Sequence, residues 1–126
     1  MPLFFGEGMA KKDIVSVNDL SLIMDLFEGG AKLISVNYVS CTQSATVNDV
    51  KTARLTFMGK KKFDLEFCGV DCLHIVPIAM GSIMLSDIAV GKFGSMVFWA
   101  DDSSFNVSEP DSSLSYVIAR SLSVIC

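Results

Sequence analysis

The sequence of 126 residues has few of the side chains on which catalytic and metal sites usually depend. It contains one histidine, His74, whose neighbours are apolar, and no glycine-rich loop of the kind that cradles nucleotide phosphates. Only one closely spaced cysteine pair is present, Cys68 and Cys72, whereas a structural zinc site needs four ligands. The sequence therefore predicts a protein that is not an enzyme, binds no metal and needs no cofactor.

Long apolar runs are also missing. None approaches the roughly 20 residues that span a bilayer, and the first residues lack the basic region and apolar core of a secretory signal. We therefore expect a soluble, cytoplasmic protein without a membrane partner. In that reducing compartment the four cysteines, Cys41, Cys68, Cys72 and Cys126, are expected to be free thiols.

What the sequence does contain is apolar volume, since 51% of its residues are hydrophobic and only 19% are charged. This balance argues against disorder and allows a large core. The length suits one domain over residues 1–126.

Apolar runs in the middle of the chain predict an antiparallel sheet. Phe63, Leu65 and Phe67 alternate with acidic residues, which is the period of a half-buried strand. Residues 58–62 join this run to an earlier one as a hairpin, in which Gly59 is free to take positive φ. Because the separators are short, the strands must be antiparallel. Further strands are expected at residues 73–78, 83–90 and 96–99.

The flanking sequence adds one helix and two more strands. Asn18 or Asp19 can cap a helix over residues 18–28, which Gly29 and Gly30 would end. Strands are predicted at residues 31–41, with Ile34, Val36 and Tyr38 on one side, and at 116–125, with Ile118, Leu122 and Val124 on one side; residues 1–12 form an arm. The apolar face of the helix is formed by Leu20, Ile23, Met24 and Phe27, widened by Leu22 and Leu26.

The predicted fold class is α+β: a mainly antiparallel sheet, as a sandwich or a half-barrel, with one short helix packed on it. The apolar residues of these runs also predict which side chains form the core. They are Phe57, Leu65, Phe67, Leu85, Ile88 and Phe98.

Charge is unevenly distributed along the chain. Residues 1–63 hold eight Lys/Arg and six Asp/Glu, for +2, and residues 64–126 hold two and eight, for −6, which together give the net −4. Residues 93–119 include no Lys or Arg. Such a field repels phosphate backbones, so nucleic acid is not an expected partner, and it attracts a basic protein.

The acidic segment after residue 100 is the predicted partner-binding site. Charged groups that flank an aromatic side chain are typical of an interface with a polar rim. The alternative is a solvated surface that only aids solubility, with Trp99 buried. The site comprises Asp101, Asp102, Glu109 and Asp111, with Trp99 and Phe105 as aromatic anchors.

Asp64 and Glu66 form a second group of carboxylates, on one strand face about 7 Å apart. Carboxylate pairs at such separations serve in catalysis, but the lysines at residues 60–62 favour a surface charge ladder instead.

Three stretches of the second half carry a family resemblance: residues 63–75, which contain Leu73-His74-Ile75; Asp87-Ile88, ahead of residues 98–102; and the serine-bearing end, residues 119–124. They resemble small bacterial immunity proteins of polymorphic toxin systems, such as contact-dependent growth inhibition. The resemblance covers residues 50–126. It implies a cytoplasmic protein that binds and neutralises one cognate toxin domain, and it assigns no site residues.

Two functions therefore stay open. In the first, acidic side chains occupy the basic cleft of a toxin, for example a nuclease, in place of substrate phosphates. In the second, the chain is a small-molecule-binding or assembly domain without catalytic activity, in which Met and Phe residues line a pocket inside a curved sheet.

Overall fold

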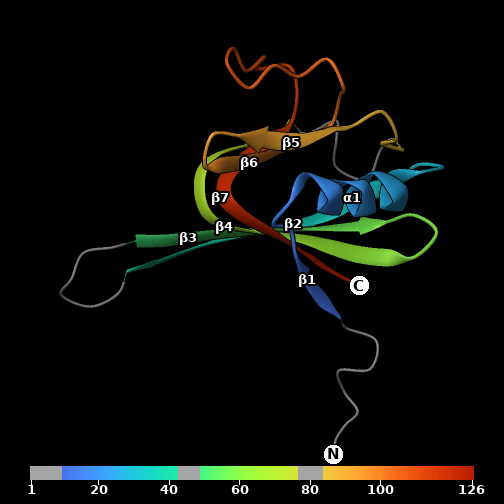
Figure 1. The fold of residues 1–126 in the computed structure, drawn as a ribbon, viewed down its shortest axis with the longest axis horizontal. Helices are drawn as coiled ribbons and strands as arrows, with labels where there is room; N and C mark the ends of the chain where they lie inside the picture. Colours follow the sequence, from blue (N-terminus) through green and yellow to red (C-terminus); the bar gives the residue numbers. More distant parts are fainter. Residues whose placement is uncertain (1–9, 43–48, 77–83) are drawn as a thin grey trace, which may run out of the picture.

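The computed structural model describes residues 10–42, 49–76 and 84–126, which form an open antiparallel sheet with one short helix (Figure 1). The sheet has the order β2-β3-β4-β7-β6-β5, and β1 pairs with the end of β7. The predicted fold class is confirmed. The strands are β1 Lys11–Asp13, β2 Lys32–Thr42, β3 Asp49–Met58, β4 Lys62–His74, β5 Ala89–Phe93, β6 Met96–Ala100 and β7 Tyr116–Ile125; a 3-10 turn, Val17–Asp19, leads into α1 Leu20–Phe27.

The central hairpin is present as predicted. Leu55 on β3 faces Leu65 on β4, and Phe57 faces Phe63, with all four side chains buried. Gly59 in the turn does not adopt positive φ. Glycine is required at this position because a larger residue does not fit: a Cβ there would lie 2.9 Å from the carbonyl oxygen of Gly30.

β4 is longer than the sequence predicts, since it continues through residue 69 to His74. Gly69 takes a φ of 67°, and the pairing with β7 shifts register between Val70 and Cys72, so the strand bends without ending. Phe67 and Val70 therefore both lie in the core, although strict alternation would place them on opposite faces. Of the strand predicted at 73–78, Leu73 and His74 are in strand conformation as the end of β4, residues 75 and 76 are not, and residues 77 and 78 lie outside the described part.

The same change of face occurs on β7. Leu122 and Ala119 are both buried, whereas Arg120 and Ser121 between them are exposed. Ile118 consequently does not share the core face of Leu122 and packs instead in a separate small cluster. The predicted parity was wrong for this residue because the bend at Gly69 reaches the neighbouring strand.

The strand predicted at 83–90 is present only at its end, because residues 89 and 90 belong to β5 whereas residues 84–88 lie outside any strand. Leu85 makes a single bridge to Ala31, and the strand proper starts at Ala89. Leu85 and Ile88 are nevertheless buried, as expected of core residues. Burial and strand pairing are separate properties, and the apolar pattern predicted only the first.

α1 lies between the β5–β6 hairpin and the strands β2 to β4, so the curved sheet wraps around the helix (Figure 1). Phe27 meets the rings of Phe57 and Phe63 at centroid distances of 4.9 and 5.3 Å. Gly29 and Gly30, with φ of 84° and 96°, end the helix as predicted. The buried face of the helix is narrower than predicted, because Leu22 and Met24 are more than two-fifths exposed. On β2, Ile34 and Tyr38 are exposed to the same extent.

The start of α1 differs slightly from the prediction. The carboxylate of Asp19 accepts hydrogen bonds from the amides of Val15 and Ser16, both at 3.0 Å. Asp19 therefore fixes the residues ahead of the helix. Residues 1–9 of the predicted arm lie outside the described residues, whereas Lys11 and Lys12 of the arm form β1 together with Asp13.

A second, smaller apolar cluster lies on the other face of the sheet at the β6–β7 end. Ala100, Phe105 and Tyr116 form it, with Phe98 packed against them. Phe98 was therefore assigned to the wrong face, since its neighbours Val97 and Trp99 occupy the main core. Sheet and loop together bury apolar surface on both faces at this end.

Candidate functional site

All of the predicted site residues except Trp99, which is on β6, fall in the segment between β6 and β7, residues 101–115, which we call the acidic loop. Phe105 fastens this loop to the sheet, with ring centroids 5.5 Å from Phe98 and 5.1 Å from Tyr116. In Figure 1 the loop projects beyond the β5–β6 hairpin at the top of the view. The loop is thus a folded extension of the sheet with its own apolar base.

Hydrogen bonds close the base of the acidic loop. The amide of Asp101 donates to the carbonyl of Ser115 at 3.0 Å, and the Ser115 amide donates to Asp101 Oδ1 at 3.1 Å. The buried Ser115 hydroxyl accepts the amide of Val76 at 2.9 Å. His74 Nδ1 donates to the Leu114 carbonyl at 2.9 Å, and its ring stacks on Tyr116. The single histidine thus ties β4 to the loop.

The loop carboxylates are held by serines of the loop itself. Asp102 Oδ2 accepts the hydroxyl of Ser104 at 2.7 Å, and Asp111 Oδ1 accepts both the amide and the hydroxyl of Ser113, at 2.9 and 2.8 Å. Glu109 is exposed. In the described part of the chain, no Lys or Arg forms an ion pair with any of the loop carboxylates. Hydrogen bonds therefore hold Asp102 and Asp111 in place, and no cation among the described residues neutralises the charges of the loop.

Two loop carboxyls have pKa values shifted in opposite directions. Desolvation raises the pKa of Asp101, despite the hydrogen bonds from Ser115, and the nearby Asp102 charge adds to the rise. Hydrogen bonds from the Ser113 amide and hydroxyl lower the pKa of Asp111. Asp101 therefore belongs to the base of the loop, whereas Asp111 presents a stabilised charge to solvent.

The two aromatic anchors of the predicted site do not reach the surface. Trp99 is fully buried in the main core, 5.5 Å from the ring of Phe57, and Phe105 is only 9% exposed. Trp99 is buried because the odd-numbered residues of β6 face the main core and α1. Phe105 is buried because it packs against Ala100 and Tyr116 at the base of the acidic loop. The predicted site is therefore corrected to its carboxylates, without an exposed aromatic side chain.

The other carboxylate pair has partners that differ from those predicted. Arg54 on β3 places Nε 3.4 Å from Asp64 Oδ2 and Nη2 3.6 Å from Glu66 Oε2, while Lys11 Nζ on β1 lies 3.0 Å from Glu66 Oε1. We call these four residues the charged ladder. The prediction that lysines 60–62 face the pair was wrong. The cations come instead from β3, which is paired with β4, and from β1, which is paired with β7.

The thiols and potential metal ligands are dispersed. Cys68, Cys72 and Cys126 are half-buried free thiols, as predicted, and the Cys41 side chain lies outside the described residues. Over residues 10–42, 49–76 and 84–126, no three His, Cys, Asp or Glu side chains come close enough to hold a metal ion.

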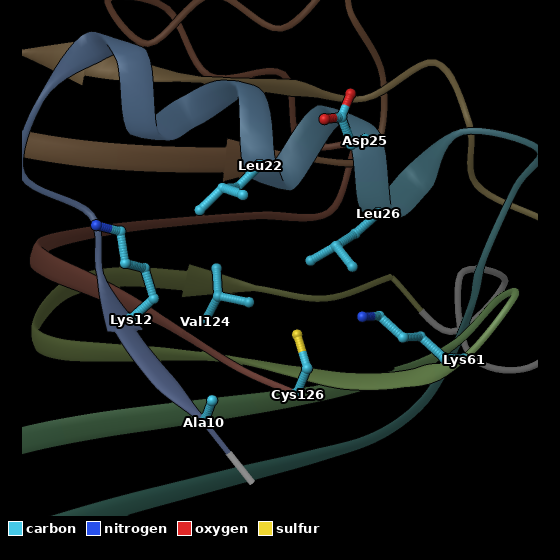
Figure 2. Close-up of a pocket in the computed structure, with 8 residues that line it drawn as sticks. All are labelled: Ala10, Lys12, Leu22, Asp25, Leu26, Lys61, Val124 and Cys126. Carbon is cyan, nitrogen blue, oxygen red and sulfur yellow. The ribbon is translucent and has the colours of Figure 1, made fainter. Parts of the chain in front are cut away.

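A pocket that the sequence interpretation missed lies between α1 and the end of β7 (Figure 2). Its volume is about 490 Å³, and we call it the α1 pocket. The available signal was the width of the apolar face predicted for the helix, because Leu22 and Leu26, which widen that face, both line the pocket. No Met or Phe of the described residues lines it. The lining consists of Ala10, Lys12, Leu22, Asp25, Leu26, Lys61, Val124 and Cys126.

Comparison of the chain with family models, curated proteins and solved structures found no match in any of the three. Among the described residues, no helix has the length and apolar character needed to cross a membrane.

Proposed function

We propose that this protein is a cytoplasmic immunity protein that binds and neutralises one cognate toxin domain with a basic surface, without catalysing a reaction. The acidic loop supplies the binding surface through Asp102, Glu109 and Asp111. The resemblance of residues 50–126 to immunity proteins supports the same function. Asp101 contributes by holding the loop in shape.

One observation carries the proposal: the loop carboxylates are ordered but unpaired with cations. Serine hydrogen bonds fix Asp102 and Asp111, so little side-chain freedom is lost when a partner binds. Because no described cation neutralises them, they project a negative field that accelerates encounter with a basic surface. A lysine-rich or arginine-rich cleft, such as that of a nuclease, fits this surface.

The test is co-purification with the toxin domain encoded beside this protein's gene, followed by association kinetics at several salt concentrations. The variant Glu109→Lys with Asp111→Lys should slow association about tenfold or more at low salt and reduce its salt dependence. Both side chains are exposed, so folding should be retained.

The matched control is Glu28→Lys with Asp71→Lys, which changes the net charge equally at two exposed positions outside the loop. Its association rate should stay close to that of the wild type. The acidic loop is excluded as the binding surface if both double variants slow association equally or if neither does. Failure of the toxin domain to bind the wild-type protein contradicts the immunity function itself.

A further inference from the structure

The α1 pocket combines an apolar floor with two cationic side chains. Leu22 and Leu26 descend from α1, and Val124 and Cys126 rise from the end of β7 (Figure 2). Figure 2 also shows Lys61 extending from the β3–β4 turn toward the space under the helix, where the Cys126 sulfur faces the same space. Its volume of about 490 Å³ lies within the range of about 300–1,000 Å³ typical of small-molecule sites.

The charges around the pocket favour an anion. Lys61 has no carboxylate within 4.0 Å among the described residues, and the ammonium of Lys12 is only loosely paired, 3.6 Å from Asp19, with a side chain 58% exposed. Asp25 has the one carboxylate side chain among the eight lining residues, so the lining side chains carry a net charge of +1 from two lysines and one aspartate. The positive lining is unusual on a chain whose net charge is −4.

We propose that the α1 pocket binds a medium-chain fatty acid, with its carboxylate on Lys61 and its alkyl chain over Leu22, Leu26 and Val124. An alkyl chain covers the apolar floor, and the head group supplies the anion that Lys61 lacks. A neutral alcohol would gain no charge-assisted contact with Lys61, and a cationic amphiphile would meet two like charges. A nucleotide would leave most of the floor without an apolar partner.

This proposal does not depend on the proposed function. The acidic loop adjoins Tyr116 at the start of β7, and the pocket contains Val124 and Cys126 at its other end. A strand of ten residues separates the two by roughly 30 Å. Loss of fatty-acid binding therefore need not alter toxin binding.

The first experiment compares three ligands of equal chain length, decanoate, decanol and decyltrimethylammonium, by calorimetric titration below their micelle concentrations. Decanoate should bind most tightly. Lys61→Gln should weaken decanoate binding about fivefold to tenfold, because a charge-assisted contact is lost. The matched control is Lys60→Gln, which removes an equal charge one residue away, outside the pocket lining, and should leave the affinity unchanged.

The second experiment tests the alkyl contact. Leu22→Ser should weaken decanoate binding severalfold, whereas Met24→Ser, at a similarly exposed position outside the pocket lining, should not. Both residues are more than two-fifths exposed, so the helix should keep its core contacts in either variant.

The thiol of Cys126 reports occupancy independently. Decanoate should slow the alkylation of Cys126 by iodoacetamide while leaving the rates at Cys68 and Cys72 unchanged, as measured by peptide mass spectrometry. Equal affinity for decanol and decanoate, together with no effect of Lys61→Gln, would overturn the proposal in favour of unspecific apolar adsorption. Unchanged labelling of Cys126 at saturating decanoate would place the ligand elsewhere and overturn it as well.

Discussion

Asp64 and Glu66 on β4 face cations from both sides, whereas Asp102 and Asp111 in the acidic loop accept hydrogen bonds only from serines two residues along the chain. The first pair lies within the sheet, where cross-strand neighbours bring Arg54 and Lys11 into range. The second lies in a loop with no paired strand to supply a cation.

The difference separates charges that serve the fold from charges available to a partner. The ladder carboxylates are only 13% and 19% exposed, so their charges need local compensation. In the loop Asp111 is exposed and Asp102 is half-buried, and hydrogen bonds from Ser113 and Ser104 hold the two carboxylates. Unpaired but ordered charge at a surface costs little in stability and favours association with an opposite charge.

The largest expected effect concerns the base of the loop. Phe105→Ala should cost about 3 kcal/mol in urea unfolding, because it removes the ring that packs on Phe98 and Tyr116. The loop should also become sensitive to limited proteolysis. The control Phe93→Ala removes a ring that is 51% exposed and should cost less than about 1 kcal/mol. Equal costs would mean that the loop does not depend on its apolar base.

Breaking the charged ladder should have the next largest effect. Arg54→Met leaves Asp64 without its cation and should cost about 1–3 kcal/mol, between the values for exposed and buried ion pairs. Lys51→Met on the same strand, where the lysine is exposed, should change stability by less than about 0.5 kcal/mol. Chemical unfolding of the two variants at low and high salt measures the difference. If Arg54→Met costs no more stability than Lys51→Met, the ladder carboxylates do not need a cation and in this respect resemble those of the acidic loop.

A smaller effect is expected from Asp101→Asn, and it depends on pH. Because the folded-state pKa is raised above its ordinary value of 3.8, the stability contribution of Asp101 is present below that pH and is lost as the pH rises through the folded-state pKa. Asparagine stays neutral and keeps an oxygen for the Ser115 amide. The variant should therefore melt at a higher temperature than the wild type at about pH 7, with the difference shrinking toward about pH 3. A lower melting temperature at neutral pH would mean that the charge itself stabilises the loop base.

The smallest effect is expected for Asp111→Asn, whose change in melting temperature at neutral pH should have the opposite sign to that of Asp101→Asn. The lowered pKa of Asp111 means that its contribution is present above the ordinary value of 3.8 and is lost as the pH falls through the folded-state pKa. Asp111→Asn keeps an acceptor for the Ser113 amide but removes the charge. We expect a slight decrease in melting temperature at neutral pH that vanishes in acid. The same direction for both asparagine variants would contradict the separate roles of the two carboxyls.

Local signals predicted several elements well. The hairpin around residues 58–62, the end of the helix at Gly29 and Gly30, and β7 follow from alternation and turn chemistry within a few residues of chain. Phe57, Leu65 and Phe67 are buried as their alternation predicts, whereas Leu85 and Ile88 are buried outside any strand. In these segments the side-chain period and the backbone preferences agree, so neighbouring residues suffice to specify the structure.

The candidate site was predicted only in part. The carboxylates of the acidic loop could be identified from composition, because a run without Lys or Arg is visible in the sequence. The burial of Trp99 and Phe105 could not, since an aromatic residue beside acidic ones suits an interface as well as a core. The α1 pocket also escaped prediction, because its lining comes from α1, β1, β7 and the β3–β4 turn.

By itself the sequence determined the periodicities, the turns and the excess of negative charge in the second half, because each depends on residues close together in the chain. The tertiary structure decided which cation pairs with which carboxylate and which face Phe98 and Trp99 occupy. It also decided that β4 continues through Gly69, where a positive φ lets the strand bend while its pairing with β7 persists. Those outcomes depend on strands up to about 110 residues apart, as in the hydrogen bond from Ser123 to Asp13, and no local pattern specifies them.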